Sequence, residues 1–276
     1  MIVGGFLLLV VAETLSPLRR SREPRLRRVI RNLVMAGAGL ATIELLQIPI
    51  LVPVSRWTMD RGLGVLNLWE ARGWARGAAT ILLLDYTLWH WHRVNHTVPF
   101  FWRFHSVHHV DRDMDASTAL RFHFGELAMS IAVRGLQIIV IGADPLSVWI
   151  YQTLLFASIL FHHSNTRLPL GFERILVRVI VTPRMHGIHH SDYRNETDSN
   201  WSSLLSLWDV LHRTILLDVA QPSITIGVPA FDDPNKVTLG KLLGMPFARR
   251  PGDWQRSDGS SSIRPHPEAG RSSLRA

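Results

Sequence analysis

The chain contains no cysteine among its 276 residues, and this absence excludes several chemistries at once. A disulfide-stabilised scaffold, a cysteine-ligated zinc site, a thiolate haem, an iron–sulfur cluster and a cysteine nucleophile all require that residue. Lysine is nearly absent too, because only Lys236 and Lys241 accompany the arginines among 30 basic residues. Charged residues make up 19% of the chain, less than in an average protein, which argues against a disordered or fibrous protein.

The formal net charge of +8 would suit a nucleic-acid partner, so the position of the arginines matters. Many of them lie beside long apolar runs, which favours a membrane surface and argues against a soluble DNA-binding protein. We therefore expect no nucleic-acid partner. The strong preference for arginine over lysine is typical of a GC-rich genome, and we expect a bacterial protein.

Several apolar runs approach the roughly 20 residues that a membrane-spanning helix needs. Met1–Ala12 predicts a weak first span, and Leu33–Val54 is long enough to cross. Gly77–Trp91 predicts a further crossing. Gly125–Phe161 holds two apolar stretches that an Asp-Pro turn at Gly142–Pro145 divides, which predicts a helical hairpin.

The flanking segments predict how the chain is oriented in the membrane. Seven arginines in Leu18–Arg31 indicate a cytoplasmic loop. Arg56–Arg76 reads as an interfacial loop. Two crossings after the arginine-rich loop would return the chain to the cytoplasmic side, where the histidines described below would meet. From residue 249 to 276 the composition is rich in Arg, Ser and Pro and predicts a disordered tail.

Histidine is abundant, with 14 residues, of which twelve lie between positions 90 and 190. They form three spaced motifs, because residues three and four apart share one face of a helix. A further pair, His162-His163, follows the apolar hairpin. The motifs are His92-Arg-Val-Asn-His96, His105-Ser-Val-His108-His109 and His186-Gly-Ile-His189-His190.

Clusters of imidazoles at helical ligand spacing predict a metal site. The three motifs supply eight imidazoles and the His162-His163 pair one more, which suffices for two ions with four or five ligands each. Nitrogen donors without thiolates suit zinc, copper, iron or nickel. The Glu-x-x-His pattern of carboxylate-bridged di-iron bundles is absent from the sequence, so the pattern indicates another kind of non-haem di-iron centre or two zinc ions.

With these motifs the sequence resembles the fatty acid hydroxylase/sterol desaturase superfamily of integral membrane di-iron oxidases. The resemblance runs from about Gly77 to Pro246. It rests on the order and spacing of the histidine motifs together with four further segments. These are Ala119-Leu-Arg-Phe-His123, His163-Ser-Asn165, Asp198-Ser-Asn200-Trp201 and Leu207-Trp208-Asp209.

The resemblance implies an all-α membrane bundle over residues 1–248, with a cytosolic helical cap and a histidine-rich core at 85–214. It also implies a set of ligands and of supporting residues. The implied metal ligands are His92, His96, His105, His108, His109, His163, His186, His189 and His190. The implied further ligands or supporting residues are His123, His162, Asn165 (holding a metal-bound water), and Asp85, Asp198 and Asn200 (accepting imidazole N–H bonds).

The implied chemistry is oxidation of an unactivated C–H bond of a lipid, such as a fatty acyl chain or a sterol-like molecule. The cofactors would be two iron ions, replaced by zinc in some preparations, and O₂, with electrons from NAD(P)H through a separate carrier protein. No catalytic residue beyond the metal centre is implied. Hydroxylation, desaturation and ether-lipid cleavage all stay open, as does the oligomeric state. A histidine-rich metal transporter is the alternative from another class, and transporters place their ligands near mid-membrane on broken helices. We expect an inner-membrane protein with its metal site on the cytoplasmic side.

Overall fold

Helices make up the regular structure in the computed structural model, which describes residues 2–68, 73–249 and 252–262. Within these ranges the β-pairing is limited to isolated bridges, for example between Ile180 and Leu205. The expected all-α class is therefore confirmed. The helices are α1 (Ile2–Leu15), α2 (Arg25–Thr42), α3 (Ile48–Asp60), α4 (Val65–Leu68), α5 (Gly73–Thr97), α6 (Pro99–His109), α7 (Phe124–Ile141), α8 (Pro145–His163), α9 (Leu170–Leu176), α10 (Pro183–His189), α11 (Arg194–Thr197), α12 (Leu207–Leu211) and α13 (Leu239–Gly244), with a π-helical turn η1 (Ile43–Gln47) and short 3₁₀ turns η2 (Thr118–Leu120), η3 (Gln221–Ser223), η4 (Pro229–Phe231), η5 (Pro234–Val237) and η6 (Met245–Phe247).

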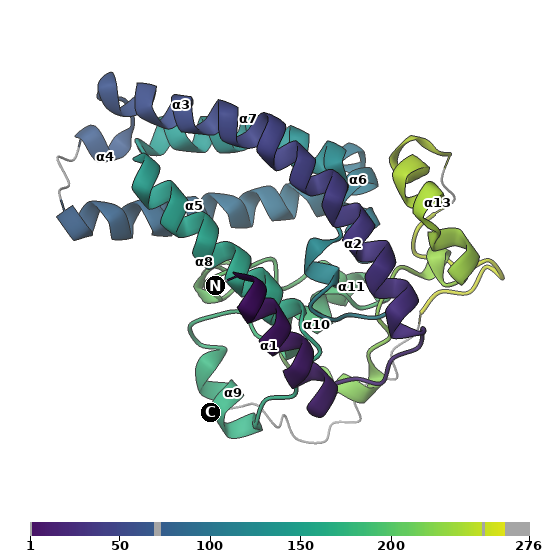
Figure 1. Ribbon diagram of the computed structural model, residues 1–276. Helices are drawn as coiled ribbons and strands as arrows, with labels where there is room; N and C mark the ends of the chain where they lie inside the picture. Colours follow the sequence, from purple (N-terminus) through teal and green to yellow (C-terminus); the bar gives the residue numbers. More distant parts are fainter. Residues whose placement is uncertain (1, 69–72, 250–251, 263–276) are drawn as a thin grey trace.

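A bundle of long helices forms one side of the molecule (Figure 1). The π-helical turn joins α2 and α3 into one long helical rod that packs along α7. Helix α5 packs against both α7 and α8. Leu84 of α5, Ile138 of α7 and Leu155 of α8 are all nearly inaccessible to solvent and belong to one apolar core cluster.

Three segments are long and apolar enough to cross a membrane: Arg25–Leu68, Phe124–Ile141 and Pro145–His163. In the most apolar window of the first, only 17% of the residues are buried inside the protein, so its side chains face outward as lipid contact requires. Together with the family relationship reported below, these segments indicate an integral membrane protein. The crossing expected at Gly77–Trp91 is not among them. Helix α5 is long enough, but it carries Asp85 together with arginine and histidine residues, and these lower its mean hydropathy.

The hairpin expected around Gly142 is present between α7 and α8. Gly142 ends α7 in the left-handed conformation (φ 78°), which a residue with a Cβ adopts only at a cost. Asp144 then caps α8, accepting a hydrogen bond from the Ser147 amide at 2.9 Å, and Pro145 occupies the first helical position.

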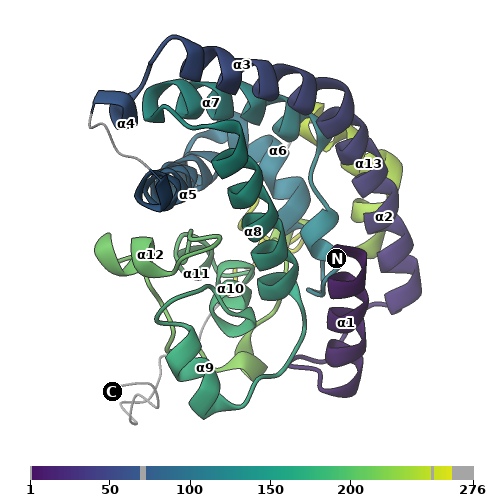
Figure 2. The same ribbon diagram turned by 60° about the vertical axis from the view of Figure 1, so that its left-hand side comes forward.

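A cap of short helices lies at one end of α5 and α8 (Figure 2). Helix α10 packs against α8, and α6 packs against α5 after a turn at Val98 and Pro99. Helix α1 runs beside α8, where Pro17 pairs with Thr166 in an isolated bridge. The cap thus brings α5, α6, α8 and α10, which carry the histidine motifs, to one place.

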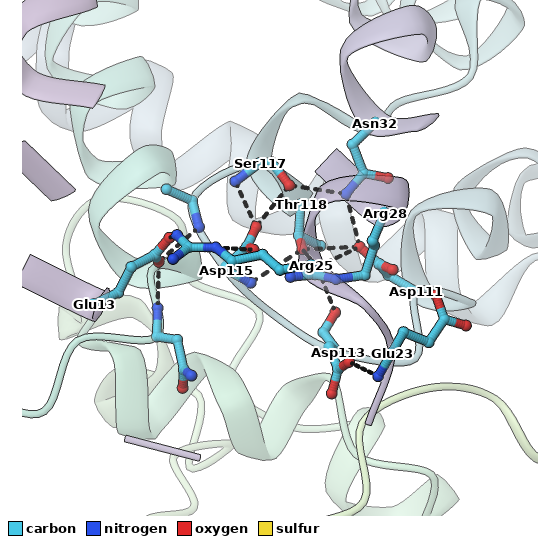
Figure 3. Close-up of polar contacts among 12 residues, drawn as sticks. Glu13, Glu23, Arg25, Arg28, Asn32, Asp111, Asp113, Asp115, Ser117 and Thr118 are labelled. Carbon is cyan, nitrogen blue, oxygen red and sulfur yellow. Dashed lines mark hydrogen bonds and ion pairs between the residues drawn. The ribbon is translucent and has the colours of Figure 1, made fainter. Parts of the chain in front are cut away.

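Only residues 18–24 of the arginine-rich stretch Leu18–Arg31 form the loop that the sequence suggests. Helix α2 begins at Arg25, and its arginines form a buried ion-pair network (Figure 3). Arg25 pairs with Glu13 of α1, and Arg28 pairs with Asp111 at 3.1 Å and with Asp115. Asp111 and Asp115 lie 83 and 87 positions after Arg28 in the chain, so the local composition did not reveal them.

This network fixes the loop that follows the second histidine motif. Burial alone would raise the pKa of Asp111, but the guanidinium groups of Arg28, Arg121 and Arg31 lower it to about 2. Asp111 therefore stays charged while fully buried, and it also accepts a hydrogen bond from Asn32 at 2.9 Å. Because Asp111 comes two residues after His109, the network holds α6 against the start of α2.

Part of the C-terminal segment packs where its composition predicts disorder. Trp254 stacks on Trp102 with ring centroids 6.0 Å apart, and the Trp102 indole N–H donates to the Asp253 carboxylate at 2.7 Å. Arg256 pairs with Asp192 at 2.7 Å. Trp254, Asp253 and Arg256 make these contacts. The polar composition around them gave no indication that this segment packs. The remainder of the expected tail, residues 250–251 and 263–276, lies outside the described residues.

Candidate metal centre

Five histidines from three helices form the first group: His92 and His96 of α5, His105 and His109 of α6, and His189 of α10. In each of them, one ring nitrogen lies within 4.8 Å of the corresponding nitrogen of every other member. The i, i+4 spacing places each pair from α5 and α6 on one helical face, as the sequence pattern predicts. The rest of the group comes from tertiary packing, which brings α10 opposite α5 and α6.

Four histidines form the second group: His108 of α6, His163 at the end of α8, and His186 and His190 at α10. Their Nε2 atoms converge. The distance is 2.9 Å from His108 to His163, 3.0 Å from His163 to His186, and 3.1 Å from His186 to His190. Both groups are largely shielded from solvent.

The donors of both groups fit metal ions. In a tetrahedral site with metal–nitrogen bonds of about 2.0 Å, nitrogens lie about 3.3 Å apart, close to the spacing of the second group. In the first group, the Nε2 atoms of His105, His109 and His189 and both ring nitrogens of His96 are buried without a hydrogen-bond partner in the described part of the chain. Unpaired buried polar atoms are costly, and a bound cation would satisfy them.

Burial also keeps the rings in the protonation state that binds metal. It lowers the pKa of His189 to about 3 and, with the neighbouring imidazoles, holds those of His108 and His109 well below the usual range. The same causes act on His186 and His190. These rings are therefore neutral at physiological pH.

Acceptors behind three rings of the first group fix their orientation. A ring nitrogen that donates behind a ligand sets its tautomer and leaves the other nitrogen free for the metal. The Nδ1 contacts are His92 to the Trp201 carbonyl at 2.7 Å, His189 to the Ser199 carbonyl at 2.7 Å, and His105 to the Glu126 carboxylate at 2.8 Å.

The two carbonyls belong to a loop that other side chains hold firmly. Buried Asp209 accepts hydrogen bonds from the Trp201 and Ser202 amides at 3.0 and 2.9 Å and from the Trp89 indole at 3.0 Å. Asn200 adopts a left-handed backbone conformation (φ 54°), which asparagine tolerates better than most residues. Its side-chain amide donates to the Met185 and Leu216 carbonyls and, contrary to our expectation, forms no hydrogen bond with an imidazole of the described residues.

Asp85 and Asn165 also differ from the expected roles. The Asp85 carboxylate accepts from the Trp208 indole at 2.6 Å and from the Leu205 amide at 3.1 Å. It therefore anchors the start of α12, and it bonds to no imidazole in the described part of the chain. Asn165 was expected to hold a metal-bound water. Its side chain instead bonds the backbone N–H and C=O of Arg19 at 2.9 and 2.8 Å, so it fastens the α1–α2 connection.

His123, His162 and Asp198 lie outside both groups. His123 caps α7, accepting from the Gly125 amide at 3.0 Å, and this capping favours the structural role over the ligand role. The ring of His162 lies 4.1 Å, centroid to centroid, from that of His186, beside the second group. Asp198 approaches His96 only to 3.9 Å, beyond hydrogen-bond distance.

Glu126 is the functional candidate to which the sequence analysis gave no role. It is buried in the first turn of α7, where its carboxylate holds His105. One signal was available, because an ionisable residue at the start of an apolar membrane helix is a functional candidate by default. The carbonyls of Ser199 and Trp201 gave no such signal, since every residue has one.

A cavity of about 550 Å³ leads away from the histidines between α2, α5, α7 and α8. His92, His105, His108, His163 and His186 line one end of it. Non-polar residues, chiefly leucine, isoleucine, phenylalanine, alanine and glycine, line most of the remainder. Both histidine groups thus border a space suited to an apolar molecule.

The chain was compared with known proteins. The sequence model of the fatty acid hydroxylase family matches residues 77–214. The chain is 30% identical over 173 residues to ornithine lipid hydroxylase OlsE of Rhizobium tropici, covering 62% of this chain and 50% of that protein. It is 27% identical over 136 residues to alkylglycerol monooxygenase of Homo sapiens, covering 49% of this chain and 29% of that protein.

A third relative is cholesterol 25-hydroxylase of Mus musculus, 25% identical over 138 residues, with coverage of 49% of this chain and 45% of that protein. The chain thus matches half or less of the length of each of these relatives. No solved structure matches it. The family match covers half of the chain and includes all nine clustered histidines, and on this basis the chain belongs to the fatty acid hydroxylase family.

Proposed function

We propose that the protein is a membrane-bound, O₂-dependent oxidase that hydroxylates an unactivated C–H bond of a lipid at a centre of two iron ions. The observation that carries this proposal is the meeting of two imidazole groups, of five and four histidines, at one end of an apolar cavity. Bound iron would supply O₂ activation, with electrons from NAD(P)H delivered through a separate carrier protein.

The protein's own residues bind, orient and exclude water. The nine histidines would hold the two ions, and the Trp201 and Ser199 carbonyls and Glu126 would keep three of the rings aligned. The apolar walls would place a lipid chain beside the histidines and limit the access of water. No other catalytic group is needed in this proposal.

The proposal is compatible with three outcomes for the lipid. Hydroxylation is favoured, because two of the three relatives described above are named as hydroxylases. Cleavage of an ether lipid is the second candidate, since another relative is named alkylglycerol monooxygenase. Desaturation at the same centre is the third.

A metal transporter fits the arrangement less well. Its ligands would lie near the middle of broken spanning helices, whereas here His163 is the last residue of α8 and the other motifs lie outside the candidate spans. For the location we propose the inner membrane of a bacterium, with the histidines on the cytoplasmic side, where a soluble electron carrier could reach them.

Metal analysis and lipid analysis together test the function. Detergent-purified protein from iron-replete cells should contain two metal ions per chain, and expression in a lipid-producing host should yield a hydroxylated lipid that a His189→Ala variant does not produce. A stoichiometry near one would contradict the two-ion centre. Two bound ions without any oxidised lipid, in the presence of a competent reductase, would contradict the oxidase.

A further inference from the structure

The end of the cavity away from the metal centre contains an arginine that pairs with no carboxylate among the described residues. Arg134 lies in the middle of α7, inside the candidate membrane span Phe124–Ile141, and lines the cavity together with Gln152 of α8. Its Nη1 donates to the Gln152 side-chain oxygen at 2.6 Å. Its Nε is buried and has no hydrogen-bond partner among the residues that the structure describes.

In the part of the chain that the structure describes, no carboxylate forms an ion pair with Arg134, whose Nη1 bonds to the neutral Gln152. Among the residues that line the cavity, Glu126 is the one acidic side chain, and it is engaged with His105 at the opposite end. The side chain of Gln152 supplies Arg134 with a single neutral hydrogen-bond acceptor. A charge in a membrane-spanning helix is costly unless it is paired, and unpaired ones commonly mark a binding site. The missing partner is therefore an anion that enters the cavity.

Two helices give the distance between this arginine and the metal centre. Arg134 follows Glu126 by eight positions on α7, which is about 12 Å along the helix axis. Gln152 precedes His163 by eleven positions on α8, which is about 16 Å. The polar pair and the histidines therefore lie at opposite ends of one elongated cavity, and its walls between them are mostly apolar.

We propose that Arg134, with Gln152, binds the anionic head group of a single-chain lipid and thereby sets which carbon lies at the metal centre. This inference rests on the proposed function of the cavity as a lipid site. A cavity of about 550 Å³ is of the size that encloses one small molecule, so a single chain with a compact head fits better than a whole two-chain lipid. Both a carboxylate and a phosphate offer oxygens that a guanidinium binds in bidentate fashion.

Equilibrium binding on the full chain in detergent tests the role of Arg134 without requiring turnover. The probe is radiolabelled hexadecanoic acid, and the competitors are hexadecyl phosphate and the neutral hexadecan-1-ol. The Arg134→Met variant removes the charge with little loss of volume, and Arg134→Lys restores it. Arg27→Met is the matched control, because Arg27 is exposed on α2 and does not line the cavity.

We expect Arg134→Met to weaken binding of at least one anionic ligand by roughly 10- to 100-fold, as loss of a charge-assisted hydrogen bond predicts, and to leave hexadecan-1-ol within twofold. Arg134→Lys should recover most of the loss, and Arg27→Met should bind like the unmodified protein. If the variant binds only the acid more weakly, the site recognises a carboxylate. If it binds only the alkyl phosphate more weakly, the site recognises a phosphate. Equal loss for all three ligands, or none for any, overturns the proposal.

A second measurement covers the case in which Arg134→Met does not fold. Gln152→Leu removes the neutral neighbour and should change the binding ratio of acid to alcohol by severalfold, while an unchanged ratio would count against the site. Each binding measurement is made on both the metal-loaded and the metal-free protein, so the result does not depend on activity. An inactive protein that still prefers anions through Arg134 would refute the oxidase and retain the head-group site.

Discussion

Gly187 of α10 gives a sharp test of how the cap holds the metal centre. The guanidinium of Arg19, from the α1–α2 connection, packs directly on the Cα of Gly187, and a Cβ there would overlap it. This guanidinium is shielded from solvent in this position, and this lowers the pKa of Arg19 to about 9. Its Nη2 donates to the Pro183 carbonyl at 3.0 Å and to the Gln221 side chain. A Gly187→Ala change would displace this group.

The size of the effect follows from the bonds that would be lost. Two hydrogen bonds from a charged group contribute about 1.5–3 kcal/mol each. The higher helix propensity of alanine stabilises the folded protein by up to about 1 kcal/mol and offsets part of this loss. The net destabilisation should therefore be about 2–5 kcal/mol, which lowers the melting temperature by roughly 4–20 °C in a protein of this size.

The assay is thermal unfolding of the detergent-purified protein, with bound metal quantified in parallel. Gly171→Ala on α9 is the control, because its Cβ would meet no atom within 4 Å. We expect Gly187→Ala to unfold at a lower temperature and to bind less metal, since α10 contributes histidines to both groups. Equal melting temperatures and equal metal content in the two variants would refute the argument that Arg19 braces α10.

The remaining predictions concern the ligands and the buried ion pairs. His189→Ala should lose bound metal and activity, whereas His90→Ala should retain both, because the His90 ring packs 4.9 Å from that of Trp89 and belongs to neither group. Glu126→Gln should weaken metal binding by about 10–100-fold in competition with a chelator, and unchanged affinity would argue against its orienting role. Arg28→Met should destabilise the protein by about 3–5 kcal/mol in thermal unfolding, since it leaves buried Asp111 with weaker pairing. Removal of metal by chelation should lower the melting temperature, and an unchanged value would show that the ions do not stabilise the cap.

The membership of the nine-histidine cluster could be predicted from the sequence, but its division into two groups could not. Consecutive helical residues differ in direction by about 100°, so His108 and His109 must point to different places. His189 and His190 divide in the same way. Which ring of each pair joins which group depends on how α6, α8 and α10 pack, and residue spacing does not contain that information.

The supporting residues were harder to predict than the ligands. The family resemblance implied Asp85 and Asn200 as partners of the imidazoles, yet backbone carbonyls of the loop before α12 take much of that role. Any residue can supply a carbonyl, so composition gives no signal. The apolar hairpin followed from its own sequence, whereas the helical start of α2 depends on acidic partners far along the chain.

The π-helical turn Ile43–Gln47 keeps the buried residues of α2 and those of α3 on the same side of the long helical rod. In α2 the buried positions advance by four and three residues, through Met35 and Gly39 to Thr42. In α3 they continue at Leu51, Ser55 and Thr58, and Gln47 lines the cavity one turn before Leu51.

From Thr42 to Gln47 the step is five residues, the repeat of a π turn. An uninterrupted α-helix would place Leu51 about 180° around the rod from Thr42. The π turn thus takes up one extra residue without rotating the buried residues of α3 away from those of α2. Deleting a single residue from 43–47 would leave eight residues from Thr42 to Leu51, a rotation of about 80° in a continuous α-helix. Leu51 and Ser55 would then keep facing inward, and the hydrogen bond from Ser55 to the Ala143 carbonyl at 2.6 Å would persist.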